Sequence, residues 1–409
     1  MTYVNSTELM RLAGKPIYTN DLTDACLRAR LNLFLQGDTG SGKTQLEAEA
    51  MSYFPDKSLF VLGRNDMDIR ELFQQINLEK LKTAKSSAEL KELTDKINYN
   101  LIVVDELPNC VPAVRSQLFN LFDGYIEING KKYDIGKGYS VGIASGNIGQ
   151  QFTESSNDLG RALKDRMHVI VDMDYFKPTA GDSSRILADS TNPRVEFGQA
   201  GDKSQEFIKS AEEIKARPLD WQKLLVANYL LHGLDYCEVG GRPTSKTKLS
   251  NALGPNWYTV FGTGSNSAGS DETLVLPVSM RAAKSVIRLS HALEDIAKSK
   301  GATKVSPIDS MLNAWKFVSA YSGVLNEHVV KQNANYNGDR YKVMDALIQG
   351  TRTQFEQQQQ NIEAGMNMVA DGELKESVLN KFSGRWGFMK DTLQSLLEQN
   401  PKNNGGAAP

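Results

Sequence analysis

Short runs of consecutive apolar residues alternate with helix-like patterns over about the first 175 residues of the chain. Runs of this length between turn signals are candidate strands. Because each run is continuous rather than alternating, we expect each strand to be buried on both faces. Strands that alternate with helices are typical of an α/β fold, in which helices cover a parallel sheet. The candidate strands are Leu31–Leu35, Leu59–Leu62, Leu101–Val104, Val141–Ala144 and Val169–Val171.

From about residue 205 the pattern becomes mainly helical. The join Lys177–Arg194 is rich in Pro, Ser and Asp, which predicts a linker. The glycine- and serine-rich stretch 262–270 predicts a mobile surface loop, and residues 400–409 predict a disordered tail. The expected helices are Trp221–His232, Met280–Lys300, Pro307–Tyr321 and Tyr341–Ala370.

Composition changes this picture little. A net charge of -2, with 40% hydrophobic and 23% charged residues, gives no global attraction to nucleic acid. No apolar stretch of about 18 residues and no secretory pattern are present, so we expect a cytoplasmic protein without membrane insertion. Cys26, Cys110 and Cys237 are too far apart to suggest a disulfide framework or a zinc site, and we expect them to be buried.

A glycine-rich segment joins the first candidate strand to a helix-like segment. It consists of Gly37, Asp38, Thr39, Gly40, Ser41, Gly42, Lys43 and Thr44, and it fits the phosphate-loop pattern G-x-x-x-x-G-K-[ST] in full. Glycines let the backbone curl so that its N–H groups meet phosphate oxygens at a helix N-terminus. Lys43 would then reach the β and γ phosphates, and Thr44 would bind Mg²⁺. The segment predicts binding of ATP with Mg²⁺.

Two acids end the third candidate strand. The run Leu101–Val104 is followed by Asp105 and Glu106, about sixty residues after the phosphate loop. In open α/β sheets the carboxyl ends of the strands face the ligand. Asp105 would hold Mg²⁺ through its water shell, and Glu106 would polarise the attacking water. Asp172 and Asp174 also follow a strand, but we interpret them as solvent-facing acids.

At these motifs the sequence resembles the AAA+ ATPases, and within them the MoxR-like group with the cobalt-chelatase and gas-vesicle ATPases. The segment Tyr125–Ile135 looks like the hairpin that these ATPases insert, and Asn129-Gly130 is a hairpin-turn signal in its own right. The resemblance implies a P-loop α/β core over residues 1–178, with the hairpin near 125–138. It further implies a helical lid over 179–335 with a loop-rich insertion at about 181–270, and a helical extension over 336–399.

Three more site residues follow from the resemblance. Asn147, after Val141–Gly146, matches the first sensor, which reads the γ-phosphate. Arg166, in a segment ending Asp165-Arg166-Met167, matches the arginine finger, although Met replaces the family's Phe and Arg161 is an alternative. Arg281 matches the second sensor of the lid. Each of the three residues also has an alternative interpretation without a role in catalysis. Asn147 could be a turn asparagine, Arg166 a surface arginine in an ion pair, and Arg281 an exposed arginine on a helix.

The resemblance also implies partners. An arginine finger acts in a neighbour's site, which implies self-assembly into a ring, a hexamer in this family. MoxR-like proteins remodel protein clients, often ones with a von Willebrand A-type domain. A ring motor on nucleic acid is the alternative, favoured by Lys131, Lys132 and Lys137 but disfavoured by the net charge of -2.

Overall fold

The computed structural model describes residues 3–76, 79, 91–128, 130–147, 160–198, 201–261 and 271–399. The chain divides into two compact units. Unit 1 comprises Met1–Arg217 and Arg288–Val305, and unit 2 comprises Pro218–Ile287 and Ser306–Pro409. Residues 179–217 and 288–305 therefore group with the sheet, whereas the sequence-based division assigned them to a lid. The expected loop 262–270 and the expected tail 400–409 lie outside the described residues.

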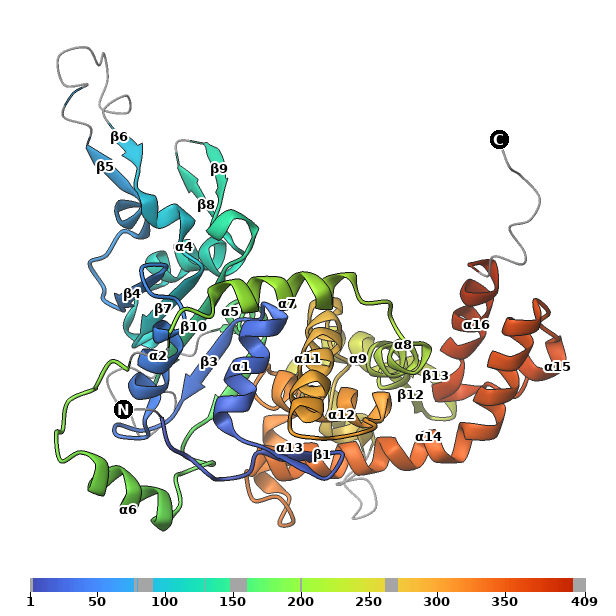
Figure 1. Ribbon diagram of the computed structural model, residues 1–409. Helices are drawn as coiled ribbons and strands as arrows, with labels where there is room; N and C mark the ends of the chain where they lie inside the picture. Colours follow the sequence, from blue (N-terminus) through green and yellow to red (C-terminus); the bar gives the residue numbers. More distant parts are fainter. Residues whose placement is uncertain are drawn as a thin grey trace. The chain divides into compact units, whose positions relative to one another are not determined.

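A five-stranded parallel sheet forms the core of unit 1 (Figure 1). Its order is β11-β3-β10-β7-β4, and every neighbouring pair is parallel. All five candidate strands are confirmed. Their bounds are β3 Leu33–Gln36, β4 Ser58–Leu62, β7 Leu101–Asp105, β10 Val141–Gly146 and β11 Val169–Asp172.

The expectation of burial on both faces is wrong for β4. Leu59 and Val61 are buried, but Phe60 is 41% exposed and Leu62 is 51% exposed. In the described part of the chain β4 pairs with β7 alone and so forms one edge of the sheet. An apolar run cannot reveal this, because its place at the edge depends on the order of all five strands.

Helices and small hairpins surround the sheet in unit 1. The helices are α1 Thr19–Ala29, α2 Lys43–Ser52, α4 Pro112–Phe122, α5 Gly160–Lys164, α6 Ala180–Asp189 and α7 Ser204–Ala216. The hairpins are β1 Met10–Leu12 with β2 Lys15–Ile17, β5 Gln74–Ile76 with β6 Lys91–Leu93, and β8 Tyr125–Ile128 with β9 Lys131–Asp134. Short 3₁₀ turns lie at η1 Ile69–Leu72, η3 Asp95–Asn98, η4 Leu107–Asn109 and η5 Gly136–Gly138.

The β8–β9 pair corresponds to the hairpin expected from the sequence. Ile128 pairs with Lys131, which leaves a loop of two positions between the strands. Gly130 occupies one of them with φ +74°, a conformation that glycine adopts without strain. Asn129, the other position, lies outside the described residues.

The expected linker Lys177–Arg194 contains a helix instead. Thr179 caps α6, because its side chain accepts a hydrogen bond from the backbone N–H of Asp182 and the Asp182 carboxylate accepts one from the backbone N–H of Thr179. Asp182 also accepts hydrogen bonds from Ser6 N and Ser6 Oγ at 2.9 and 2.8 Å. This tie spans 176 residues of sequence. The polar composition of the segment therefore reflects capping and long-range contacts rather than a linker.

Unit 2 is mainly helical, as expected, but residues 181–270 are not loop-rich where the structure describes them. In unit 2 they hold a helix that continues into a π-turn, a hairpin, another helix and a long 3₁₀ turn. These elements are α8 Trp221–Asn228, η6 Tyr229–Gly233, β12 Tyr236–Val239, β13 Arg242–Ser245, α9 Lys246–Leu253 and η7 Gly254–Phe261.

The remaining helices confirm three of the expected ones. They are α10 Asp271–Leu274, α11 Met280–Ser299, α12 Pro307–Ser319, α13 Glu327–Gln332, α14 Arg340–Asp371, α15 Glu376–Leu379, η8 Gly384–Trp386 and α16 Phe388–Glu398. Residues of α11 from Arg288 onward belong to unit 1. None of the helices in the described ranges has the length and apolar character needed to cross a membrane.

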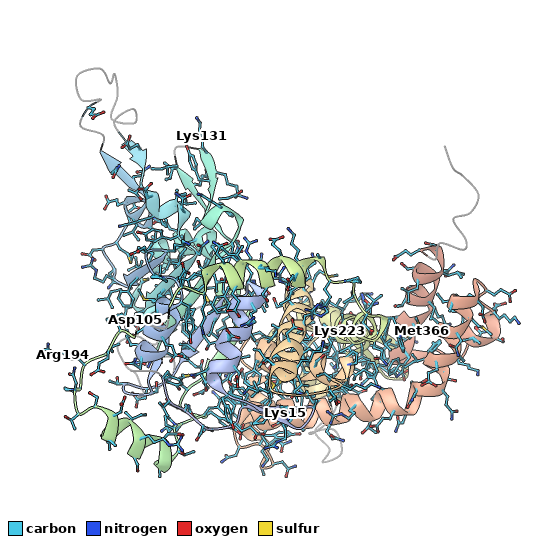
Figure 2. All side chains as sticks on the ribbon, in the orientation of Figure 1. Lys15, Asp105, Lys131, Arg194, Lys223 and Met366 are labelled. Atoms are coloured by element: carbon cyan, nitrogen blue, oxygen red, sulfur yellow. The ribbon has the colours of Figure 1, made fainter. Side chains whose placement is uncertain are left out.

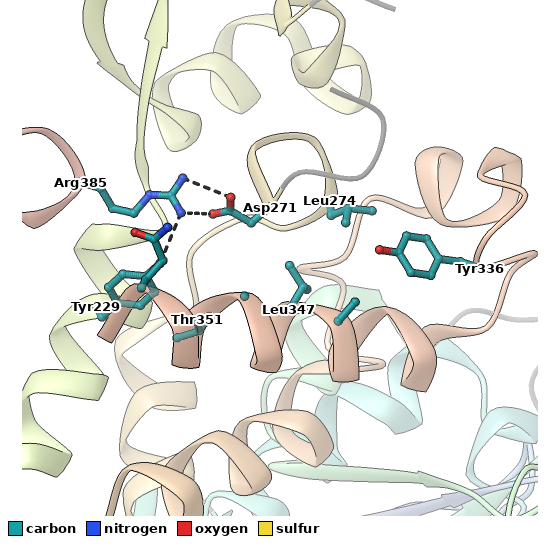
Figure 3. Close-up of a pocket in the computed structure, with 10 residues that line it drawn as sticks. Tyr229, Asp271, Leu274, Tyr336, Leu347, Thr351 and Arg385 are labelled. Atoms are coloured by element: carbon teal, nitrogen blue, oxygen red, sulfur yellow. Dashed lines mark hydrogen bonds and ion pairs between the residues drawn. The ribbon is translucent and has the colours of Figure 1, made fainter. Parts of the chain in front are cut away.

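A pocket of about 230 Å³ lies inside unit 2 (Figure 3). Arg385 forms an ion pair with Asp271 at 2.6 Å and donates a hydrogen bond to the Tyr229 hydroxyl. Nearby, Lys246 is completely buried and donates hydrogen bonds to the carbonyls of Asp271 and Val275. Burial lowers the pKa of Lys246 to about 8, against the opposing charge of Asp271.

Candidate nucleotide-binding site

The predicted phosphate loop, Gly37–Thr44, joins β3 to α2. Gly42 precedes the first helical residue with φ +88°, and a Cβ there would meet the Tyr3 ring at 3.0 Å. Both facts require glycine at this position. The N-terminus of α2 therefore opens onto the loop, where its free N–H groups and dipole favour an anion.

Lys43 connects the loop to the candidate sensor. Its Nζ donates hydrogen bonds to Gly37 O at 2.9 Å, Asp38 O at 2.8 Å, Ser41 Oγ at 3.3 Å and Asn147 Oδ1 at 3.1 Å. All four acceptors are uncharged, and within the described ranges Lys43 forms no ion pair. A buried ammonium without a carboxylate partner fits an anionic ligand such as a polyphosphate.

The two acids lie at the carboxyl end of β7, as expected, and Figure 2 labels Asp105 there. Asp105 Oδ1 accepts hydrogen bonds from Ser145 Oγ at 2.5 Å and from Glu106 N at 3.0 Å. Glu106 lines the same pocket as the phosphate loop and has φ +56°, a conformation that costs a non-glycine residue free energy. Burial, and then the charge of Asp105, raise the pKa of Glu106.

These residues fit Mg²⁺ bound with a nucleotide. Mg²⁺ prefers hard oxygen ligands and takes most of them from phosphates and water, with one or two from protein. The Thr44 hydroxyl and the Asp105 carboxylate would hold it here. The described part of the chain contains no cluster of three or more His, Cys, Asp or Glu side chains that could bind a metal by themselves.

Glu47 is a site residue that the sequence did not reveal. It lies in α2, one turn after Thr44, and is completely buried. Neither carboxylate oxygen makes a hydrogen bond. Burial, and then the charge of Asp105, raise its pKa well above the ordinary value, against the opposing effects of Ser145 and Lys43. No pattern marked it, because α2 is buried on more than one face and lacks an apolar stripe.

Asp172 and Asp174 are half-buried rather than solvent-facing. Asp174 Oδ2 accepts a hydrogen bond from the backbone N–H of Asp38 at 2.6 Å, so this carboxylate touches the phosphate loop. Asp172 Oδ1 accepts one from the Asp174 backbone at 3.0 Å. Both acids therefore shape the turn after β11, which the sequence interpretation missed.

Arg166 does not line the pocket of its own chain. Its Nε donates to Asp123 Oδ2 at 2.9 Å, its Nη1 donates to Ala162 O, and its guanidinium lies 4.9 Å from the centre of the Phe119 ring. The side chain is 22% exposed. The side chain of the alternative, Arg161, lies outside the described part.

Arg281 is half-buried at the start of α11 and belongs to unit 2. Its part in the nucleotide site stays a prediction.

The pocket itself has a volume of about 470 Å³ and a wall that the sequence did not predict. The phosphate loop, with Gln45 and Glu106, forms one side. Residues after β11 and in and beyond α6 form another. These are Pro178, Ile186, Ser190, Asn192, Pro193, Arg194 and Val195, and the N-terminal Tyr3 and Val4 complete the lining.

Comparisons with known proteins agree with this geometry. The family described as the AAA domain, dynein-related subfamily, matches residues 32–167, which span β3 to the turn before β11. A search of curated proteins found no match. Among solved structures, the chain is similar to a candidate ATPase of Cytophaga hutchinsonii, with a TM-score of 0.54 and 14% identity, over 82% of this chain and 89% of that one.

A full-length MCM homologue from Methanopyrus kandleri is similar with a TM-score of 0.43 and 14% identity, over 73% of this chain and 53% of that one. This likeness is too low to support an argument. The first structure shares the fold, and the family match covers the phosphate loop, the two acids and Asn147. Residues 32–167 therefore form an AAA domain, the chain has the α/β P-loop fold of AAA+ proteins with a helical C-terminal region, and it is an ATPase.

Proposed function

We propose that this ATPase requires Mg²⁺, assembles into a ring and couples ATP hydrolysis to the remodelling of a protein partner, as the MoxR-like resemblance implies. The observation that carries the proposal is the convergence of three elements around the phosphate loop. Lys43 of the phosphate loop contacts Asn147 at the end of β10, and Glu106 at the end of β7 lines the same pocket as the loop.

Each residue has a defined part in hydrolysis. Lys43 and the loop N–H groups would bind the phosphates, and Asn147 would connect the γ-phosphate to the sheet. Bound Mg²⁺ would neutralise charge that builds up on the phosphates. Glu106 would accept a proton from the attacking water, and its raised pKa makes it a better base than an ordinary carboxylate.

Ring assembly rests on Arg166. The guanidinium is partly exposed and lies outside the pocket of its own chain, which supports action on a neighbouring subunit. Its ion pair with Asp123 would orient the side chain until a neighbour's phosphate competes for it. A guanidinium supplied in this way is worth about 10³–10⁵ in rate.

Two inactive variants can test the ring. Arg166→Ala lacks the finger but keeps its own site, whereas Glu106→Gln keeps the finger but has an inactive site. Each variant alone should hydrolyse ATP far more slowly than the natural protein. Mixed subunits should regain activity, because an Arg166→Ala site then faces an intact finger. If the mixture stays inactive, the proposal of a finger acting between subunits fails, and Arg161→Ala should be tested in the same way.

One observation favours a nucleic-acid motor instead of a protein client. Lys131 is exposed at the start of β9, beside the hairpin turn (Figure 2), and Lys132 lies over the Tyr125 ring at 4.2 Å. Two lysines on a projecting hairpin could follow a phosphate backbone. They are few, however, and the net charge of -2 gives no wider attraction.

The two partners can be separated by capture. Glu106→Gln should bind ATP and hold its partner without releasing it. Affinity purification of this variant with ATP should recover a discrete protein, which mass spectrometry would identify. Nucleic acid that is released by salt, together with ATPase stimulation by DNA or RNA, would favour the motor.

A further inference from the structure

The segment Ser190–Glu196, which we name the strap, follows α6 and passes along the nucleotide pocket. Five of its residues, Ser190, Asn192, Pro193, Arg194 and Val195, line the pocket together with the phosphate loop. Figure 2 labels Arg194 on this segment. The strap belongs to the stretch that the sequence predicted to be a linker, so no role was expected for it.

The strap is attached directly to the phosphate-binding helix. Gln45 is the residue after Thr44, and its amide pairs with the backbone of Glu196 in both directions. Gln45 Nε2 donates to Glu196 O at 2.9 Å, and Glu196 N donates to Gln45 Oε1 at 3.3 Å. A side-chain amide that satisfies both backbone groups of a residue fixes that residue in position and orientation. The contact spans 151 residues of sequence.

Hydrogen bonds inside the strap fix its shape. Ser190 Oγ donates to Glu196 Oε1 at 2.9 Å and accepts from Asn192 N at 3.1 Å. Asn192 Oδ1 accepts from Arg194 N at 3.1 Å, and Pro193 between them has a restricted φ. At its other end, α6 is held by Asp182 and Ser6. The backbone that carries Arg194 is therefore supported on both sides.

The guanidinium of Arg194 remains available. Its side chain is exposed, and among the described residues it has neither an ion pair nor a hydrogen bond. The acid beside it, Glu196, already accepts a hydrogen bond from Ser190. Arginine presents a planar fork of N–H donors that matches phosphate oxygens, and a fork on a fixed backbone loses less entropy on binding.

We propose that the strap is a nucleotide-binding element and that Arg194 binds the polyphosphate of the nucleotide held by its own chain. Arg194 thereby adds a second cation to Lys43 in the lining of the same pocket. The pairing of Gln45 with Glu196 connects this contact to α2. The inference rests on the pocket being the nucleotide site, and it assigns Arg194 a part in binding rather than in the chemical step.

Nucleotide affinity tests the strap directly. Displacement of a fluorescent ADP analogue would give the Kd values of ADP, AMP and adenosine for each variant. Arg194→Ala should weaken ADP binding by roughly tenfold, the loss expected for one charged hydrogen-bonding group. The loss should shrink for AMP and disappear for adenosine, which has no phosphate. Arg194→Lys should recover part of the affinity, because it restores the charge without the fork.

Arg185→Ala is the matched control. Arg185 lies in the neighbouring α6, is exposed, and does not line the pocket, so the variant changes the net charge equally. It should bind ADP within about twofold of the natural protein. Gln45→Ala should release the strap, and Arg194→Ala should then cost less in that background than alone.

Two results would overturn the proposal: equal ADP affinity for Arg194→Ala and Arg185→Ala, or an equal loss for ADP and adenosine. Lys43→Ala distinguishes this failure from failure of the nucleotide site. If Lys43→Ala abolishes ADP binding while Arg194→Ala does not affect it, the site stands and the strap proposal is wrong. If neither variant affects binding, the pocket is not the nucleotide site.

Discussion

Replacement of Glu47 should stabilise the protein. Glu47 is completely buried, and neither of its oxygens has a hydrogen-bond partner. The group therefore loses its hydration on folding, and Ser145 and Lys43 offset only part of that cost. Glu47→Met keeps the length of the side chain but removes both oxygens. Glu47→Gln keeps the shape and removes only the charge, so the two variants separate the cost of burying a charge from that of burying a polar group.

The magnitude follows from general costs. A buried group left without a hydrogen bond costs about 1–3 kcal/mol, and more when it is charged. Glu47→Met should therefore raise the free energy of unfolding by at least about 1 kcal/mol at pH 7.5. In a domain of 150–250 residues each kcal/mol shifts Tm by about 2–4 °C.

The pH dependence carries a definite sign. The pKa of Glu47 is raised in the folded state. At a pH between the unfolded and the folded pKa, the folded protein therefore holds a proton on Glu47 that the unfolded protein has released. Any advantage of the natural residue is fully present below the unfolded pKa of about 4.3 and is lost progressively as the pH rises through the folded pKa. Between those two values Glu47→Gln should gain on the natural protein by about 1.4 kcal/mol per pH unit.

Glu49→Gln provides a matched control on the same helix. Glu49 is also buried, but its carboxylate accepts hydrogen bonds from Tyr3 N at 2.5 Å and from the Tyr53 hydroxyl at 2.7 Å. The same substitution should destabilise the protein here by about 1 kcal/mol. Urea unfolding at pH 5, 6.5 and 8 would measure all the variants.

The reasoning is refuted if Glu47→Gln and the natural protein keep the same difference in stability at pH 5 and pH 8. It is also refuted if Glu47→Met is less stable than the natural protein. If Glu47→Met is more stable but hydrolyses ATP more slowly, the buried carboxyl serves Asp105 at a cost in stability, as functional sites often do.

Three further predictions concern other parts of the chain. Arg166→Ala should bind ATP within about twofold of the natural protein but lose about 10³-fold or more in turnover; unchanged turnover in a coupled ATPase assay would exclude a finger role. Asp182→Ala should lose about 1–2 kcal/mol in urea unfolding at pH 7, because it removes the cap of α6 and the tie to Ser6. Burial alone would raise the pKa of Asp182, but hydrogen bonds from Ser6 and Thr179 lower it, so this stability should disappear as the pH falls below about 3.9. The folded pKa of Lys246, about 8, lies below its ordinary value of 10.5. The free energy of unfolding of the natural protein should therefore increase by up to about 3 kcal/mol as the pH rises from about 8 to 10.5. Lys246→Met should lack that gain, and an equal pH response of both proteins would contradict the burial of the ammonium.

Local signals were sufficient to predict the sheet and the positions of the phosphate loop and the two acids beside it. Each strand is an apolar run, and the phosphate loop is a contiguous pattern whose geometry depends on its own glycines. The positions of Asp105 and Glu106 follow directly from the apolar run that forms β7 and ends at Asp105. In these cases the residues that determine the local structure lie within a few positions of the structure that they form.

The features that were missed depend on contacts between distant parts of the chain. The exposure of Phe60 follows from the place of β4 at the sheet edge. The position of the strap depends on Gln45, which lies 151 residues before its partner Glu196. Glu47 looks like any helix residue until β7 and β10 place Asp105 and Ser145 beside it. Composition cannot report such contacts.

ATP turnover by the purified protein tests the central claim most directly. It should be measured with Mg²⁺ and with a chelator, in parallel with Lys43→Ala and Glu106→Gln, and nucleotide binding should be measured on the same samples. We predict Mg²⁺-dependent hydrolysis by the natural protein, loss of binding in Lys43→Ala, and binding without hydrolysis in Glu106→Gln. Hydrolysis by Glu106→Gln at the natural rate would contradict the assignment of this pocket as the catalytic site.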